Sequence, residues 1–159
     1  MNKEYKELLF QYLSMALPYN IIVRHADYLV DDEGNETSKF WYSYGYLRNV
    51  CSLDNMTTTI IESEGSDNEG YEHICDLERS LPYLRDMKDM TDEEKEEWRK
   101  STCVVWDNDS DTTPDFARHA YSNYIGVAWL LKNRFDFMGL IEKGLAIRIT
   151  EKNNPYEKY

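Results

Sequence analysis

The spacing of hydrophobic residues at the start of the chain predicts an amphipathic helix. Between positions 5 and 17 these residues recur at intervals of three and four, which places them on one helical face. They are Tyr5, Leu8, Leu9, Tyr12, Leu13, Ala16 and Leu17. Pro18 fits the end of this helix, because a proline disfavours the helical conformation in the residue before it.

A series of extended segments follows this helix. Residues 20–30 and 39–47 are rich in β-branched and aromatic residues, and the acidic stretch 31–36 between them contains a glycine. This order predicts a hairpin with a long loop. Two further strands are predicted at 57–62 and 71–77. Consecutive strands with short connections usually pair antiparallel, so we expect an antiparallel sheet.

The second half of the chain begins with a helix signal. Thr91 and Glu94 have the spacing of a capping box, and the helix that it opens is predicted to run to about Lys100. A short strand is expected at residues 103–106, followed by a polar loop at 107–112.

A second helix signal begins at Thr113, a suitable N-cap that is followed by Pro114 and Asp115. The hydrophobic face expected for this long helix comprises Ala117, Tyr121, Tyr124, Ala128, Leu131 and Phe135. Residues 135–144 predict a turn and a short helix that ends at Gly144, with Lys143 beside its last carbonyls. The alternation over residues 145–149 favours a strand.

These elements predict one α+β domain that spans residues 1–159. We expect an antiparallel sheet of three to five strands, with an N-terminal helix and a long C-terminal helix packed on it. A chain of 159 residues is long enough to bury a core of its own. The sequence contains no internal repeat and no convincing linker.

The net charge of −12 restricts the classes of partner. Residues 54–97 carry 15 acidic and 4 basic side chains and hold most of the excess. Such a surface repels phosphate backbones, so we do not expect direct nucleic-acid binding. We expect a protein partner, in particular a basic one. No apolar run is long enough to cross a membrane. The three cysteines form no CxxC pair and are odd in number, which favours reduced thiols and a cytoplasmic location.

The stretch Phe40–Tyr46 is the most unusual candidate for a binding surface. On a strand, Phe40, Tyr42, Tyr44 and Tyr46 would share one face, and Trp41 would lie on the other. We favour packing of these rings in the core or under a second layer. The alternative is an exposed recognition surface of the composition that interfaces favour.

The candidate partner-binding residues come from this strand and from the helix that follows Thr91. On that helix the glutamates are explained most simply as a solvated face, although they would also suit a basic partner. The candidates are Tyr42, Tyr44, Tyr46, Glu93, Glu94, Glu96 and Glu97.

Two patterns resemble metal sites only in part. Residues 107–111 match the first five positions of a calcium loop, but Thr112 replaces the required glycine and Arg118 the closing glutamate. His73 and Cys75 would share one face of a strand, but two ligands do not make a zinc site. Since motifs for nucleophilic, phosphate or metal chemistry are absent, we assign no catalytic residue, metal or cofactor.

Two blocks of the chain resemble a known family. Residues 81–94, LPYLRDMKDMTDEE, and residues 135–146, FDFMGLIEKGLA, are similar to blocks in a family of small uncharacterised proteins carried by bacteriophages and mobile elements of gut anaerobes. Asp86 stands where the family pattern has proline, and Met138 where it has arginine. Both blocks are rich in turn and capping residues, so we favour a structural role for them. The resemblance implies a phage-related origin and supplies no mechanism.

Together these observations lead to two functional hypotheses. The first is a non-catalytic accessory protein of a phage or mobile element that binds a host or phage protein. The alternative is a small-ligand-binding protein or minor enzyme with a pocket between sheet and helices.

Overall fold

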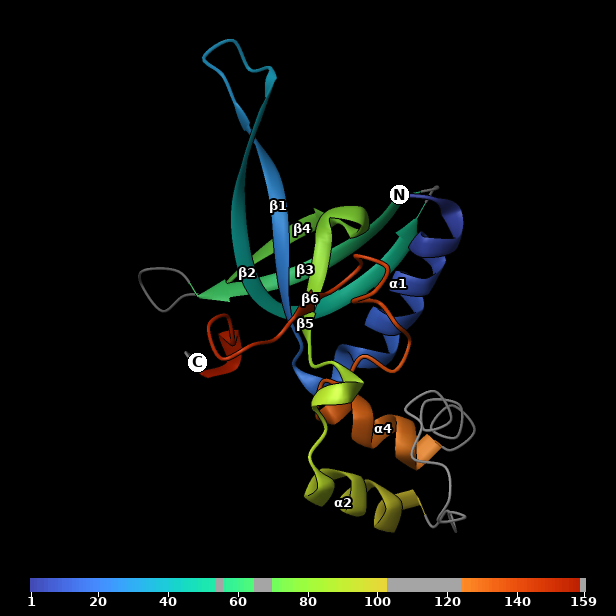
Figure 1. Ribbon diagram of the computed structural model, residues 1–159. Coiled ribbons are helices and arrows are strands. Elements are labelled where there is room, and N and C mark those ends of the chain that lie inside the picture. Colours follow the sequence, from blue (N-terminus) through green and yellow to red (C-terminus); the bar gives the residue numbers. More distant parts are fainter. Residues whose placement is uncertain (54–55, 65–69, 103–123, 158–159) are drawn as a thin grey trace.

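The computed structural model describes residues 1–53, 56–64, 70–102 and 124–157, which form a mixed α/β fold (Figure 1). Its longer elements in chain order are α1 (Lys3–Ala16), β1 (Ile22–Val30), β2 (Glu36–Leu53), β3 (Met56–Glu64), β4 (Gly70–Asp76), β5 (Ser80–Leu84), α2 (Asp92–Thr102), α4 (Tyr124–Lys132) and β6 (Ile147–Arg148). Short 3₁₀ turns lie at Leu17–Tyr19, Leu77–Arg79, Met87–Asp89 and Pro155–Glu157. The predicted N-terminal helix and predominantly antiparallel sheet are confirmed.

The strands are ordered β4-β3-β2-β1-β5-β6, and every pair is antiparallel except β5 with β6. Four long strands make up most of this sheet. β5 and the two-residue β6 extend it beyond the predicted three to five strands. The sequence interpretation missed β5, because Pro82 lacks the amide hydrogen that an inner strand usually donates. In the structure Pro82 lies opposite Val23.

β2 is much longer than predicted because it pairs with two different strands. Its first part pairs with β1, and from Tyr46 onward it pairs with β3. On the other side, β5 pairs with β1 only as far as His25. The segment 26–42 therefore extends past the rest of the sheet as a two-stranded hairpin, which we call the arm (Figure 1).

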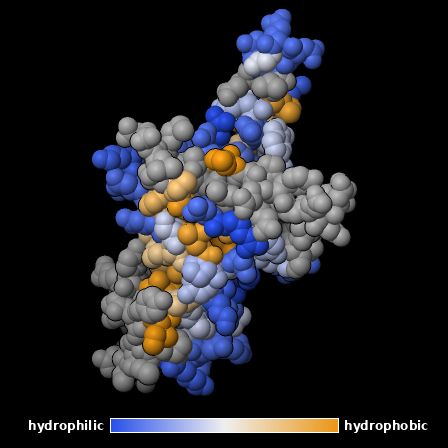
Figure 2. Space-filling view, turned by 180° about the vertical axis from the view of Figure 1, so that it is seen from behind, coloured by the Kyte–Doolittle hydropathy of each residue, from blue (hydrophilic) through white to orange (hydrophobic). Residues whose placement is uncertain are grey.

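The tip of the arm confirms the predicted turn. The carboxylate of Asp31 accepts hydrogen bonds from the backbone amides of Glu33 at 3.0 Å and Asn35 at 2.8 Å. Gly34 has φ +84°, a conformation that residues with a side chain rarely adopt. Seen from behind, the tip is hydrophilic, whereas hydrophobic residues form an oblique band on the body (Figure 2).

α1 supplies one layer of the core. Asn2 caps its first turn by accepting from the amide of Tyr5 at 2.8 Å. The residues buried on α1 are Leu9, Tyr12, Leu13 and Ala16, all of them from the predicted face. They belong to one buried cluster with Val23 and Leu47 of the sheet and with Trp98 and Leu130 of the other two helices.

Of the predicted long C-terminal helix, the structure describes only the short helix α4. The proposed start of the predicted helix at Thr113 lies outside the described residues, as do the predicted strand 103–106 and loop 107–112. The described helix α4 ends at Lys132, and Arg134 then adopts a left-handed φ of +63°. Phe135 is consequently not on the helix. α4 packs mainly against α2 and α1, below the sheet in Figure 1, and not on the sheet face.

The two blocks that resemble the phage family pack against each other. Arg85 forms a parallel bridge with Phe135, in which its amide donates to the carbonyl of Arg134 at 2.8 Å and its carbonyl accepts from Asp136 at 2.8 Å. The predicted short helix within 135–144 is a series of turns, and the predicted strand 145–149 is reduced to β6. Gly144, predicted to end that helix, has φ +70° and lies at the end of these turns.

Candidate functional site

The aromatic residues of β2 lie on one side of the sheet and are joined there by residues of β1. Tyr28 lies opposite Phe40, and Arg24 lies opposite Tyr44. Opposed residues of an antiparallel pair point to the same side of the sheet. We call this surface the tyrosine face. It comprises Arg24, Tyr28, Phe40, Tyr42, Tyr44, Tyr46 and Tyr83.

Three of the seven residues of the tyrosine face are exposed rings, so the favoured interpretation of core or second-layer packing is wrong for them. Tyr42 is 48% exposed, Phe40 44% and Tyr44 40%. Trp41, on the opposite side of the arm, is 41% exposed. Both sides of the arm lie beyond β5 and beyond the helices that the structure describes. Tyr46, nearer the body, is half-buried.

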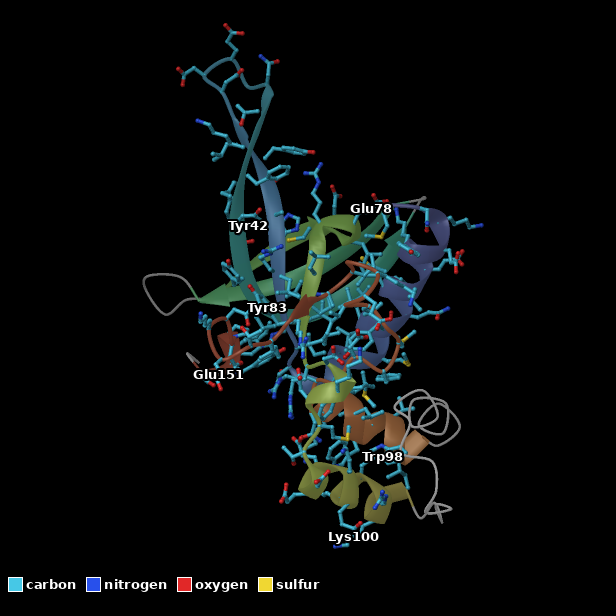
Figure 3. All side chains as sticks on the ribbon, in the orientation of Figure 1. Tyr42, Glu78, Tyr83, Trp98, Lys100 and Glu151 are labelled. Atoms are coloured by element: carbon cyan, nitrogen blue, oxygen red, sulfur yellow. The ribbon has the colours of Figure 1, made fainter. Side chains whose placement is uncertain are left out.

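Ring contacts connect the face across three strands. The ring centroids of Tyr28 and Phe40 are 4.6 Å apart, and those of Tyr44 and Tyr83 are 6.2 Å apart. Figure 3 places Tyr42 on the arm and Tyr83 nearer the base of the sheet. Burial raises the pKa of Tyr83 to about 12, with Tyr44 contributing, so its phenol stays protonated at neutral pH.

Guanidinium groups lie among these rings. Arg24 stacks over Tyr42 at 4.6 Å, Arg79 over Tyr28 at 4.3 Å and Arg48 over Tyr46 at 5.4 Å. Each distance is within the range of a cation–π interaction. These arginines place positive charges among the rings, although the chain as a whole is strongly acidic.

The base of the face is held by the C-terminal segment. The hydroxyl of Tyr156 accepts from the amide of Ile22 at 2.9 Å and donates to the carbonyl of Tyr83 at 3.3 Å. Arg134 stacks over the Tyr156 ring at 3.8 Å. Burial raises the pKa of Tyr156 to about 12, so the hydroxyl keeps the proton that it donates. The strands below the arm are therefore fixed to the body.

The acidic candidates on α2 form a separate surface. α2 lies at the opposite end of the molecule from the arm, as the labels of Lys100 and Tyr42 show in Figure 3. Glu94 accepts two hydrogen bonds from Arg85, at 2.6 Å and 2.9 Å, which hold the pKa of its carboxyl below the usual value. Glu96 pairs with Arg99 at 3.4 Å and with Lys100 at 3.6 Å.

Glu94 also confirms the predicted capping box. Its carboxylate accepts from the amide of Thr91 at 2.9 Å, and the Thr91 hydroxyl accepts from the amide of Glu94 at 3.2 Å. Glu93 and Glu97 are exposed. Of the four glutamates, two are therefore engaged in the protein's own ion pairs, and the structure does not bring any of them to Tyr42, Tyr44 or Tyr46.

A buried polar group, missed by the sequence interpretation, lies where β1 meets β5. The hydroxyl of Ser80 donates to the carbonyl of Asp76 at 2.9 Å and lies 3.5 Å from Nδ1 of His25. Cys75 is buried, and burial raises the pKa of its thiol to about 12, with Asp27 contributing. A thiol with that pKa is a poor nucleophile at neutral pH. Packing and hydrogen bonding account for these residues without a reaction.

The partial metal patterns receive no new support. Cys75 lies on a strand with His73 as predicted, but the side chain of His73 and the loop 107–111 lie outside the described residues. Among the residues that are described, no group of three or more potential ligands could hold a metal ion. No helix in the same part of the chain is long and apolar enough to cross a membrane.

Comparisons with family models, curated proteins and solved structures found no match. The resemblance to phage proteins therefore stays a prediction from the two sequence blocks. The tyrosine face is accordingly interpreted from its own residues.

Proposed function

We propose that this protein is a non-catalytic accessory protein of a bacteriophage or mobile element, and that it binds another protein through the tyrosine face. The observation that carries the proposal is the exposure of Phe40, Tyr42 and Tyr44 on one face of β2. Large exposed aromatic clusters are uncommon on monomers and often mark interaction sites. The phage origin is supported by the sequence resemblance alone.

The composition of the face supports a protein partner. Tyrosine and arginine are enriched among the residues that contribute most binding energy in protein interfaces. Tyrosine offers a rigid apolar ring and a polar hydroxyl at a small cost in side-chain entropy. The arm extends past the rest of the sheet (Figure 1), and Phe40 and Tyr42 are exposed on it, so a partner can contact them without rearrangement of the core.

The alternative of a ligand pocket between sheet and helices has no comparable support in the described part of the chain. The side chains that face each other there are buried in one hydrophobic cluster, which includes Leu9, Leu13, Val23 and Leu47. Residues of this kind fill the space as a core. This supports a binding surface on the outside of the sheet.

Affinity capture compares two double variants with the parent. Tagged proteins are produced in phage-infected host cells, and captured proteins are identified by mass spectrometry. Tyr42→Ser with Tyr44→Ser removes two rings, each expected to cost more than about 1 kcal/mol at an interface, so a partner should be lost at least tenfold. Glu93→Lys with Glu97→Lys tests the acidic surface and should leave that partner bound.

Circular dichroism and thermal unfolding confirm that both variants are folded before capture. Both pairs of residues are exposed, so neither change is expected to alter the core. If the folded tyrosine variant retains every partner of the parent, the proposed function is rejected. If only the glutamate variant loses the partner, the interface lies on α2.

A further inference from the structure

Arg24 occupies the centre of the tyrosine face. Its guanidinium stacks on Tyr42, and its strand partners are Tyr44 on β2 and Leu81 on β5. Tyr44 in turn contacts Tyr83. The positive charge of Arg24 lowers the pKa of Tyr83, against the larger effect of burial, so the guanidinium also lies near that phenol. One half-buried cation is thus surrounded by three tyrosines.

From this geometry we infer that Arg24 is the anchor for a carboxylate of the partner, and that the segment bound on the tyrosine face is acidic. This inference rests on the proposed function and specifies the chemistry of the partner. It replaces, for this face, the expectation of a basic partner that the net charge suggested.

Arg24 differs from the other two arginines of the face, which contact polar side chains of the protein itself. Arg79 lies 3.6 Å from a carboxylate oxygen of Asp27 and 3.8 Å from one of Asp76, and Arg48 donates to the side chain of Asn20 at 3.0 Å. Among the carboxylates whose side chains the structure describes, none forms an ion pair with Arg24. A half-buried guanidinium without a counter-ion favours an incoming carboxylate.

The donors available at Arg24 fit a carboxylate. A guanidinium presents a planar set of N–H groups that can bind both oxygens of one carboxylate. The hydroxyls of the exposed Tyr42 and Tyr44 can each donate to the same group or to a neighbouring one. The exposed rings of Phe40 and Tyr42 would cover an apolar side chain next to it. An acidic residue beside an aromatic or aliphatic one is the expected recognition element.

A phosphate could also pair with Arg24, and nucleic-acid bases could stack on the tyrosines. However, nucleic-acid binding draws its affinity from several cations that neutralise successive phosphates. Arg79 and Arg48 are already engaged, and the arm ends in the carboxylates of Asp31, Asp32 and Glu33. The net charge of −12 would further oppose a polyanion. These observations favour an acidic protein segment.

The test selects binders from a library of displayed short random peptides on the immobilised full chain. Enriched peptides are synthesised, and their affinities are measured by fluorescence anisotropy. We expect them to share an aspartate or glutamate, and we expect Arg24→Gln to weaken their binding by about tenfold or more. Arg99→Gln, a matched change on α2 far from the face, should leave binding unchanged.

A charge exchange separates a direct contact from a structural effect. Arg24→Glu should lose the acidic peptide and should bind the same peptide with lysine in place of its acidic residue. Arg24→Lys keeps the charge but not the planar fork, so its affinity should be intermediate. Thermal unfolding of each variant confirms that the arm is intact.

Three outcomes would overturn the inference. Enriched peptides could lack acidic residues, they could bind Arg24→Gln as tightly as the parent, or no sequence could be enriched over the uncoated support. Oligo(dT) that binds in an Arg24-dependent manner would instead assign the face to nucleic acid. A partner that needs Tyr42 and Tyr44 but not Arg24 would overturn the inference and leave the proposed function in place. A partner that needs none of these three residues would overturn both.

Discussion

Replacement of Glu94 by glutamine tests how the start of α2 is held to Arg85. Glu94 joins three parts of the chain, because its carboxylate binds Arg85 through two hydrogen bonds and closes the capping box with Thr91. Arg85 in turn stacks on Phe135 at 4.3 Å. Glutamine has nearly the same size but carries no charge and offers only one acceptor oxygen. One of the two bonds from Arg85 should therefore be lost.

The expected cost follows from this geometry. A hydrogen bond to a charged group contributes roughly 1.5–3 kcal/mol net. Both side chains of the pair are half-buried, so solvent screens part of this interaction, and we expect a loss of about 1–2 kcal/mol. For a chain of this size that loss corresponds to a decrease in Tm of about 2–8 °C.

The effect should depend on pH in a defined direction. Because Arg85 holds the pKa of Glu94 below its usual value, the folded protein gains stability above the ordinary pKa of glutamate. That gain is lost as the pH falls through the lowered pKa. The difference in unfolding free energy between the parent and Glu94→Gln should therefore be largest near neutral pH and should shrink in acid.

Urea unfolding at a series of pH values, followed by circular dichroism, measures this difference. Glu93→Gln is the matched control, because Glu93 lies on the same turn and is exposed. Its effect should stay within about 0.5 kcal/mol at every pH. Equal costs for the two variants, or a Glu94 effect that persists at low pH, would refute the reasoning.

Three further outcomes are expected. Asp136→Ala should cost about 1–3 kcal/mol in urea unfolding, because the amides of Leu140 and Ile141 lose their acceptor. Since burial raises the pKa of Asp136, that cost should grow as the pH falls through this pKa, and a constant cost would contradict the assignment. In a variant with only Cys75, iodoacetamide at pH 8 should label the native thiol far more slowly than the urea-unfolded one, and equal rates would show that it is accessible. Calorimetry should show one transition, because Val23 and Trp98 share a buried cluster, and two separate transitions would contradict this.

The local elements were predictable because their signals lie within a few residues. The capping box at Thr91 and Glu94 formed as expected, and so did the turn after Asp31. The end of α4 was not predictable, since the chain turns at Arg134 with a positive φ and without a glycine to mark the position. The predicted helix therefore extended to Phe135, past the observed end of α4 at Lys132.

The placement of the tyrosine face could not be derived from the sequence for a different reason. Both sides of the strand around Tyr42 carry aromatic residues, so periodicity alone does not identify the buried side. The decision depends on how far β5 extends along β1, which is a contact between residues distant in sequence. The register that sets Arg24 opposite Tyr44 and Tyr28 opposite Phe40 is likewise a contact between distant residues.

The central claim is that the tyrosine face contacts the partner, and site-specific photocrosslinking tests it most directly. A benzophenone amino acid is placed at Tyr42 in one protein and at Glu97 in another, and phage-infected cells that produce each protein are irradiated. The account predicts a partner adduct from position 42 and none from position 97. An adduct from position 97 alone would contradict it.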